Sequence, residues 1–433
     1  MRIGLVMDYG HLAKAISLNH IAEKLFFEMG KIMNETKDFT IAATTINNVG
    51  FADVNQHFDI IAVPNMGGYR FPFDSLTSSK NLIIQLVGID EVILGREVFL
   101  SDAHYAYNKP IIEGEVKKWK ENHDKIKMIH VATEPEKDQM VKYLNLPDEK
   151  LVVIPLGIDH DIFKPTEDRL QTRKNILNKF SLNDNPYYIH ICEYNWARKN
   201  IPRMLEAFKQ ARNEGIKENL IIIGPQRDNY LTKAVKKIDG VYFLGYVKFE
   251  ELVQLVQCSN ALLFPSLHEG FGFPLVEAMA CKVPVITSNT FSPPWTAKGG
   301  GLFVNPYDVS DIKNKILEMS QNSQLRASLA EQAYERSLFF SWDKMAKQLL
   351  DLYKRHCKPK VNENYDENYD MAAYRTLVTM VEKIPELTSK FIFDILKFDY
   401  SGIIAWSIEH GFEHPETKYF LLPFKEWLHA HST

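Results

Sequence analysis

Apolar and polar positions along the first half of the chain favour strands separated by helices. Residues 2–7 (RIGLVM) predict a buried strand, and apolar residues recur at helical spacing from Ile16 to Met29. The pattern predicts further strands at Phe39–Ala43, Ile60–Val63, Leu82–Val87, Met128–Ala132 and Leu151–Ile154. Strands that alternate with helices pair in parallel and form a doubly wound sheet, which binds ligands at the carboxyl ends of its strands.

The alternation stops between residues 155 and 165, where proline, glycine and aspartate cluster without periodicity. A second series then begins, with strands predicted at Tyr187–Ile191, Leu220–Ile223, Val241–Leu244, Ala261–Phe264, Val283–Thr287 and Leu302–Val304. We therefore expect an α/β protein with two Rossmann-like doubly wound domains, residues 1–165 and 166–340, that face each other across a cleft. No residue-level repeat is detectable, so these are two similar folds and not a solenoid.

A third region follows the second series of strands. Residues 341–356 predict one more helix, within a crossover segment that we assign to 341–360. Residues 361–370 are acidic and rich in asparagine and tyrosine, which is typical of a solvated linker. Apolar residues then return at helical spacing, so we expect 361–433 to be an acidic linker and a helical extension that packs against the rest of the chain.

Composition narrows the possible functions. With 433 residues, of which 45% are hydrophobic and 24% charged, a globular protein of more than one domain is expected. The net charge of −4 leaves no overall surplus of cations for tracking nucleic-acid phosphates. No run reaches the ~18 apolar residues of a membrane span. The apolar start before Asp8 is too short for a signal-peptide core. The four cysteines have neither disulfide nor zinc-site spacing, so we expect a cytoplasmic protein, with any membrane contact peripheral.

The segment 265–280 carries the most chemistry, since it follows a predicted strand and opens a predicted helix. Gly270 and Gly272 let the backbone turn tightly and approach a ligand closely, and Pro274 suits a first helical turn. Free amides at such a helix start form an anion site that fits a diphosphate. Glu269 and Glu277 flank the turn and can accept hydrogen bonds from hydroxyl groups. By itself, the pattern fits an ordinary connection with two exposed glutamates equally well.

This segment resembles the signature of retaining glycosyltransferase family 4, in which seven residues separate two glutamates and a G-F-G-x-P motif lies between them. Residues 245–252, 283–289 and the hinge-like segment 152–159 resemble other parts of the family. The likeness runs in order from about 125 to 355 and is weak over 1–120. It implies a GT-B fold and the transfer of a hexosyl group from a nucleotide-sugar donor with retention of configuration. It implies that Glu269 contacts the donor sugar and Glu277 the ribose, within a donor site of Gly270, Phe271, Gly272, Phe273, Pro274, Leu275, Glu277 and Val247.

Arg198 and Lys199 lie between a predicted strand and a predicted helix, where two adjacent cations suit a diphosphate. They resemble the family's R-K-N helix start, and the resemblance implies that they act with Glu269 as catalytic residues. Where many members carry a G-R pair, this chain has Glu193 and Tyr194, so we assign the work of that arginine to Arg198. We expect the side chains of Lys199 and Glu269 to lie in a solvated cleft.

The first domain is expected to hold the acceptor. Asp90 takes the place of the aspartate in the family's histidine-aspartate pair, while the histidine is missing. His104 is a further candidate, although a lone histidine is more often structural. Tyr9, Gly10 and His11 follow the first strand and are expected to face the cleft on topological grounds.

The implied mechanism is electrostatic and needs no covalent nucleophile. No D-x-D motif follows a predicted strand, so no metal and no cofactor are expected beyond the donor. Two alternatives stay open: a nucleotide-sugar 2-epimerase, which shares the two-lobed architecture, and a non-catalytic sugar-binding partner subunit of a glycosyltransferase complex. A nicotinamide dehydrogenase is disfavoured because no G-x-G-x-x-G follows the first strand. The acceptor can be a glycan, a lipid carrier, a metabolite or a modified base.

Overall fold

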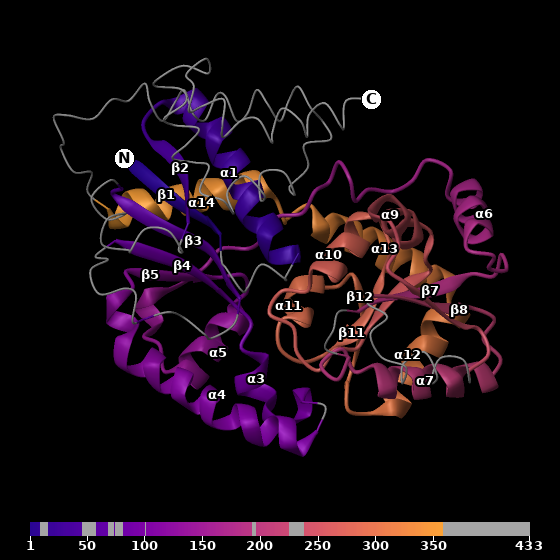
Figure 1. The fold of residues 1–433 in the computed structure, drawn as a ribbon. Coiled ribbons are helices and arrows are strands. Elements are labelled where there is room, and N and C mark those ends of the chain that lie inside the picture. The colour runs from indigo at the N-terminus through magenta and orange to yellow at the C-terminus, as the bar shows by residue number, and fades with distance from the viewer. Residues whose placement is uncertain are drawn as a thin grey trace, which may run out of the picture. The chain divides into compact units, whose positions relative to one another are not determined.

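The computed structural model of the chain describes residues 1–8, 16–45, 58–67, 73, 81–99, 101–192, 196–224 and 238–357 (Figure 1). The expected acidic linker and helical extension at 361–433 lie outside these ranges, as do Tyr9, Gly10 and His11. No helix in the described ranges is long and apolar enough to cross a membrane.

The first half of the chain forms a six-stranded sheet in the order β2-β1-β3-β4-β5-β6. The pairs β1–β2, β1–β3 and β4–β5 are parallel, as the alternation of strands and helices predicts. The strands are β1 Arg2–Asp8, β2 Thr40–Thr45, β3 Ile60–Gly67, β4 Leu82–Val87, β5 Met128–Val131 and β6 Leu151–Val153. The α-helices are α1 Ile16–Thr36, α3 Asp90–Leu94, α4 Asp102–Asn122 and α5 Glu134–Leu144, and the short 3₁₀ helices are η3 Gly95–Val98, η4 His123–Lys125 and η5 Asp148–Lys150.

The second half forms another six-stranded sheet in the order β12-β11-β10-β7-β8-β9, and all of its neighbouring strands are parallel. The strands are β7 Tyr187–Ile191, β8 Asn219–Ile223, β9 Val241–Gly245, β10 Ala261–Phe264, β11 Val285–Ser288 and β12 Gly301–Val304. The helices are α6 Arg169–Lys179, α7 Ile201–Asn213, α9 Phe249–Cys258, α10 Phe273–Ala280, α11 Pro293–Ala297, α12 Val309–Gln321, α13 Ser323–Ser337 and α14 Trp342–His356. Every strand predicted from the sequence is present, with ends that differ by a few residues at most.

Strand order in the second sheet reverses between β7 and β10. The chain runs outward from β7 to β8 and β9, then returns to β10 and runs outward to β11 and β12 on the other side. In an open parallel sheet, the crevice outside the carboxyl ends of two such strands is where ligands bind. The loops that follow Ile191 and Phe264 are therefore the place to look for a site.

The core of this second sheet explains its apolar strands. Strand β8 is buried along its whole length because helices cover both faces of a parallel sheet. Helices α7 and α12 pack side by side on one face (Figure 1), with Phe208 and Ile316 in the buried cluster. The buried hydroxyl of Tyr188 donates to the carbonyl oxygen of Ile316 at 3.2 Å, which satisfies its one donor.

Two compact units emerge from the contacts within the chain. One holds the described residues within 1–86, 121–130 and 345–357, and the other holds the described residues within 87–120 and 131–344. The domain boundaries expected at 165 and 340 stay predictions. The residues discussed below as a functional site belong to the second unit.

Close packing of β12 against β11 makes Gly301 a sensitive position. A Cβ there would fall against the carbonyl oxygen of Val285 and 2.5 Å from its Cγ2. We expect Gly301→Ala to destabilise the protein by about 1–3 kcal/mol, as overpacking does. The matched control is Gly114→Ala in α4, where a Cβ meets nothing within 4 Å and helix propensity adds about 0.5–1 kcal/mol. Thermal midpoints that move in opposite directions support this account, and an unchanged midpoint for Gly301→Ala contradicts it.

Candidate functional site

The two loops at the switch point of the second sheet carry the predicted catalytic residues. Arg198 and Lys199 lie in the turn that leads from β7 into α7, and Glu269 lies between β10 and α10. The loops are joined through their backbones, since the amide of Leu267 donates to the carbonyl oxygen of Arg198 at 2.8 Å. In return, Nη1 of Arg198 donates to the carbonyl oxygen of His268 at 2.8 Å.

Side chains from these loops, together with Asp90 at the start of α3, form a set of charges in which Lys199 and Glu269 are buried and the other two are partly exposed. It is here called the ionic cluster: Arg198, Lys199, Glu269 and Asp90. Nζ of Lys199 lies 2.7 Å from Oε1 of Glu269, and Nη1 of Arg198 lies 3.1 Å from Oε2 of the same carboxylate. Nε of Arg198 lies 3.6 Å from Oδ2 of Asp90. The carboxylate of Glu269 is thus paired with both Arg198 and Lys199, and Asp90 supplies a second negative charge next to Arg198.

The expectation that these side chains lie in a solvated cleft is wrong. Lys199 is 5% exposed and Glu269 is 6% exposed. Their mutual attraction explains how they tolerate burial, because a buried charge is costly unless it is paired and hydrogen-bonded. The ammonium group of Lys199 also lies 4.4 Å from the centre of the Phe264 ring, which adds a cation–π contact.

Burial and pairing change the acidity of the ionic cluster. Burial acts to raise the pKa of Glu269, but the charges of Arg198 and Lys199 outweigh it and lower the pKa to about 2. Burial and the neighbouring Arg198 lower the pKa of Lys199 to about 8 despite Glu269. The pKa of Arg198 is raised by Glu269 and Asp90 against the effect of burial. Glu269 is therefore an anion across the physiological range.

The glycine-rich turn 270–273 is held in place by hydrogen bonds that its carbonyl oxygens accept. The hydroxyl of Thr133 donates to the Gly270 oxygen at 3.3 Å, the hydroxyl of Thr296 donates to the Phe271 oxygen at 2.9 Å, and the Leu275 amide donates to the Gly272 oxygen at 2.9 Å. In the described part of the chain, the amides of 270–273 donate to no group. The carbonyl oxygens of the turn are therefore bonded, while its amide groups remain available as donors. Such an arrangement suits the binding of an anion.

The backbone conformation at position 272 requires a glycine, and the hydrogen bonds of the turn show which of its amides are free. Gly272 caps α10 with a φ of 86°, and a Cβ there would lie 2.8 Å from Cδ1 of Leu275. Pro274 has no amide hydrogen, and the Leu275 amide is already bonded, so the free donors end at Phe273. The buried ring of Phe271 packs edge-on against Phe273 at 5.2 Å between centroids, which anchors the turn.

Glu277 and Val247 complete the predicted donor-side residues. Glu277 lies one turn into α10, is half-buried, and forms no hydrogen bond or ion pair through its side chain with the described residues. Burial, with the nearby charge of Asp159, raises the pKa of Glu277 to about 7. Val247 is half-buried in the turn between β9 and α9.

The predicted acceptor-side residues separate into two groups. Asp90 lies at the start of α3, next to Arg198, and so belongs to the ionic cluster. His104 is exposed in the first turn of α4, where its ring lies edge-on to Phe99 at 5.1 Å. No contact joins His104 to the ionic cluster within the described ranges.

Sequence reasoning missed Glu136, a fully buried carboxylate of α5. Its Oε1 accepts from the Gly88 amide and its Oε2 from the Ala132 amide, both at 2.9 Å. A Cβ on Gly270 would lie 2.6 Å from Oε1, so the carboxylate backs onto the glycine-rich turn. The spacing Thr133-x-x-Glu136 is that of a capping box, and this signal could have found it.

His268, the residue before Glu269, is also missing from the predicted site. Its Nε2 lies 2.8 Å from Oε1 of Gln139 in α5, and its ring lies edge-on to Phe291 at 4.7 Å. Burial lowers the pKa of His268 to about 4, so the ring is neutral at physiological pH. It therefore holds the loop before Glu269 without adding a charge to the ionic cluster.

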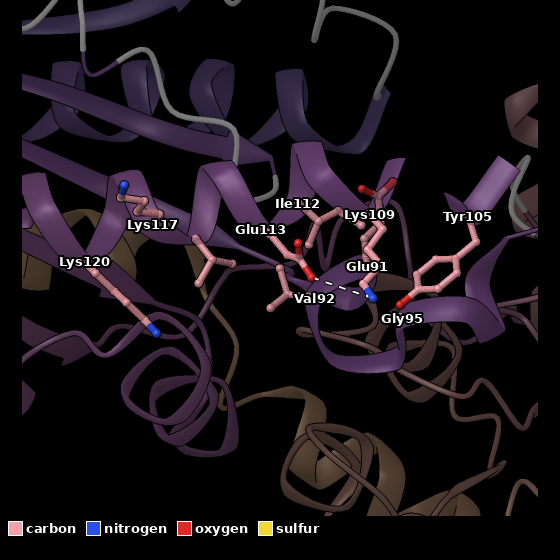
Figure 2. Close-up of a pocket in the computed structure, with 10 residues that line it drawn as sticks. Glu91, Val92, Gly95, Tyr105, Lys109, Ile112, Glu113, Lys117 and Lys120 are labelled. Carbon is pink, nitrogen blue, oxygen red and sulfur yellow. Dashed lines mark ion pairs between the residues drawn. The ribbon is translucent and has the colours of Figure 1, made fainter. Parts of the chain in front are cut away.

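A separate groove of about 470 Å³ lies between α3 and α4. Val92, Ile112 and Val116 are apolar residues of its lining. Lys109 and Glu113 also line it and form an ion pair of 3.9 Å (Figure 2). No residue of the ionic cluster lines it. The groove therefore lies apart from the residues that are predicted to be catalytic.

Solved structures of similar shape identify the fold. The two parallel sheets have the GT-B fold of glycosyltransferases, shared with solved structures that are too distant to show more than the fold. Sucrose-phosphate synthase from Thermosynechococcus elongatus aligns with a TM-score of 0.63 and 16% identity over 82% of this chain and 98% of that chain. Anabaena HepE, solved in complex with UDP and glucose, aligns with a TM-score of 0.59 and 16% identity over 82% of this chain and 100% of that chain.

The sequence around the second sheet resembles a known family. Residues 172–336 match the model of glycosyl transferases group 1. The O-antigen chain mannosyltransferase B of Escherichia coli is 28% identical over 240 residues, which are 54% of this chain and 62% of that protein. An uncharacterized glycosyltransferase of Methanocaldococcus jannaschii is 25% identical over 325 residues, 69% of this chain and 86% of that protein. The chain thus spans less than two thirds of the length of its Escherichia coli relative.

Burial of Glu136 generates a prediction about pH. Burial raises its pKa to about 7 even though two amides favour the anion. The folded protein therefore keeps a proton that the unfolded chain loses near pH 4.5, and the stability from this group falls as pH rises from about 4.5 to 7. We expect the free energy of unfolding of the wild type to fall relative to Glu136→Gln as pH rises from 5 to 7, by on the order of 1 kcal/mol per pH unit, and to level off above pH 7.

Chemical denaturation at several pH values measures this difference. Glu134→Gln is the matched control because Glu134 is exposed in the same helical turn. A Glu136→Gln difference that is constant between pH 5 and 8 would contradict the account.

Proposed function

We propose that the protein is a retaining glycosyltransferase that moves a hexosyl group from a nucleoside-diphosphate sugar to a hydroxyl acceptor. The observation that carries the proposal is the pairing of free amides at 270–273 with the ionic cluster at one switch point. The first offers donors to an anion, and the second supplies fixed charge beside it. A glycosyl transferases group 1 domain contains both loops.

In this proposal, the diphosphate of the donor accepts hydrogen bonds from the free amides at the start of α10. The positive end of the helix dipole favours the negative charge that develops on the leaving group. Arg198 and Lys199 already share Glu269, so they act as an oriented pair of positive charges rather than as mobile side chains. Glu277 accepts from the ribose hydroxyls and Val247 belongs to the donor site, as the family resemblance implies.

The reaction breaks the bond between the anomeric carbon and the phosphate oxygen and forms one between that carbon and the acceptor oxygen. The acceptor approaches the face that the diphosphate leaves, so the configuration is retained. The hydroxyl proton passes to the departing phosphate oxygen, and the products are a glycoside and a nucleoside diphosphate. The protein's contribution is electrostatic, through groups that are oriented before the reaction begins.

Names of related proteins suggest which donors to test. The Escherichia coli relative is named a mannosyltransferase, and the Anabaena structure contains UDP and glucose. A donor screen should therefore include GDP-mannose, UDP-glucose and ADP-glucose, with release of nucleoside diphosphate and the anomeric configuration as readouts. We propose that the protein works in the cytoplasm, with any membrane contact made from its surface. Incubation with donor alone tests the epimerase alternative, because only an epimerase changes the sugar without an acceptor.

The ionic cluster yields the main functional prediction. Glu269→Ala and Lys199→Ala are each expected to lower turnover about 10²-fold or more, as loss of a group that stabilises the transition state does. Because each leaves a buried partner charge, each should also destabilise the protein, by about 3–5 kcal/mol. Turnover is therefore measured well below the unfolding midpoint, with Glu269→Gln as the less disruptive variant. Lys109→Ala, at an exposed lysine, is the control, and wild-type turnover in the Glu269 variants contradicts the proposal.

We propose that transfer needs no metal ion, because the backbone amides and the two cations are placed to stabilise the leaving diphosphate. Turnover with the best donor should be unchanged by EDTA. Loss of turnover in EDTA, with recovery on addition of Mg²⁺ or Mn²⁺, would show that the charge of the leaving group is stabilised differently.

A further inference from the structure

A smaller hollow, of about 240 Å³, lies beside the ionic cluster. Its walls come from η3, from the turn before α7 and from the loop after β10, and they include Glu97, Trp196, Asn200, Pro202, Arg203 and Leu267. Leu267 directly precedes His268 and is bonded through its amide to Arg198. The hollow therefore shares its walls with the loops that position the ionic cluster.

The polar side chains of the hollow are held in place by their neighbours. The hydroxyl of Tyr307 donates to Oε2 of Glu97 at 2.9 Å, and the guanidinium of Arg203 lies 5.3 Å from the centre of the Tyr307 ring. Nη1 of Arg203 donates to Oδ1 of Asn200 at 3.1 Å. In the described part of the chain, Oε1 of Glu97 and the remaining N–H groups of Arg203 have no partner. Both side chains are thus oriented and keep free hydrogen-bonding capacity.

Apolar surfaces complete the lining. The indole of Trp196 packs partly against the buried core of the second sheet, which fixes its position. Pro202, in the first turn of α7, and the buried Leu267 add two more apolar walls. A ligand of this hollow therefore needs an apolar face as well as polar edges.

Charge decides which class of ligand fits. Glu97 and Arg203 are the two charged residues of the lining and carry opposite charges, so the hollow has no net attraction for a phosphate or a carboxylate. A carboxylate can only accept hydrogen bonds and a guanidinium can only donate them. Because both line one hollow, they suit a ligand whose groups both donate and accept, as hydroxyl groups do. A sugar ring combines hydroxyl edges with a C–H face that can lie on an aromatic ring.

We propose that this hollow binds a neutral saccharide unit of the acceptor, with Glu97 and Arg203 bonded to its hydroxyls and Trp196 against its apolar face. The inference rests on the proposed function, because the hollow adjoins the loops that are proposed to act on the donor. It makes the acceptor a glycan or a glycan-bearing molecule. Glu97 and Arg203 are then specificity-determining residues outside the donor site.

Saturation-transfer NMR of the full-length protein tests the proposal, with methyl α-mannoside, methyl α-glucoside and methyl α-galactoside as probes. At least one probe should bind the wild type. Glu97→Gln and Arg203→Met should each weaken its binding about tenfold, as the loss of one hydrogen bond to a charged group does. Lys109→Ala and Glu113→Gln, at two residues that line the separate groove between α3 and α4, are matched controls and should bind like the wild type. A melting curve for each variant confirms that the protein is folded.

Two results would overturn the saccharide site: no saturation transfer to any of the three probes, or binding that is undiminished in both the Glu97 and the Arg203 variants. Neither depends on donor chemistry. Release of nucleoside diphosphate by the wild type is measured separately, so failure of the saccharide site and failure of the proposed transferase are distinguishable.

Discussion

The carboxylate of Glu269, buried between Arg198 and Lys199, is the interaction on which the rest of the site depends. A single buried charge would be expelled or neutralised, so the three side chains are stable only together. They come from two loops that follow β7 and β10, the strands between which the sheet reverses its order. The attraction therefore ties the loops together where the topology opens a crevice.

The glycine-rich turn beside this cluster is held by hydrogen bonds to its backbone and not by ion pairs. Its carbonyl oxygens are bonded to Thr133, Thr296 and Leu275, and its amides at 270–273 are left without partners in the described ranges. An anion that binds there completes hydrogen bonds that the protein leaves unmade. In the proposed function, the turn and the ionic cluster act on the same diphosphate, the turn through its dipoles and the cluster through full charges.

Fold and site differ in how far the sequence predicts them. The strands were predictable because parallel strands covered on both faces are nearly continuous apolar runs, as in β8. The grouping of Arg198, Lys199 and Glu269 was predictable because each follows a strand, and the family resemblance supported it. Burial of Lys199 was not predictable, since the sequence does not show that one carboxylate takes both cations. Glu136 and His268 were missed because their roles depend on contacts between segments far apart in the chain.

The most direct test of the central claim is a double-mutant cycle of Lys199→Met and Glu269→Gln, with kcat/KM for nucleoside diphosphate release as the readout. If the two side chains act as one unit, each single variant loses most of the activity and the double variant loses little more than the worse of the two. Losses that simply multiply in the double variant would show that the two side chains act independently. The site would then not depend on their ion pair.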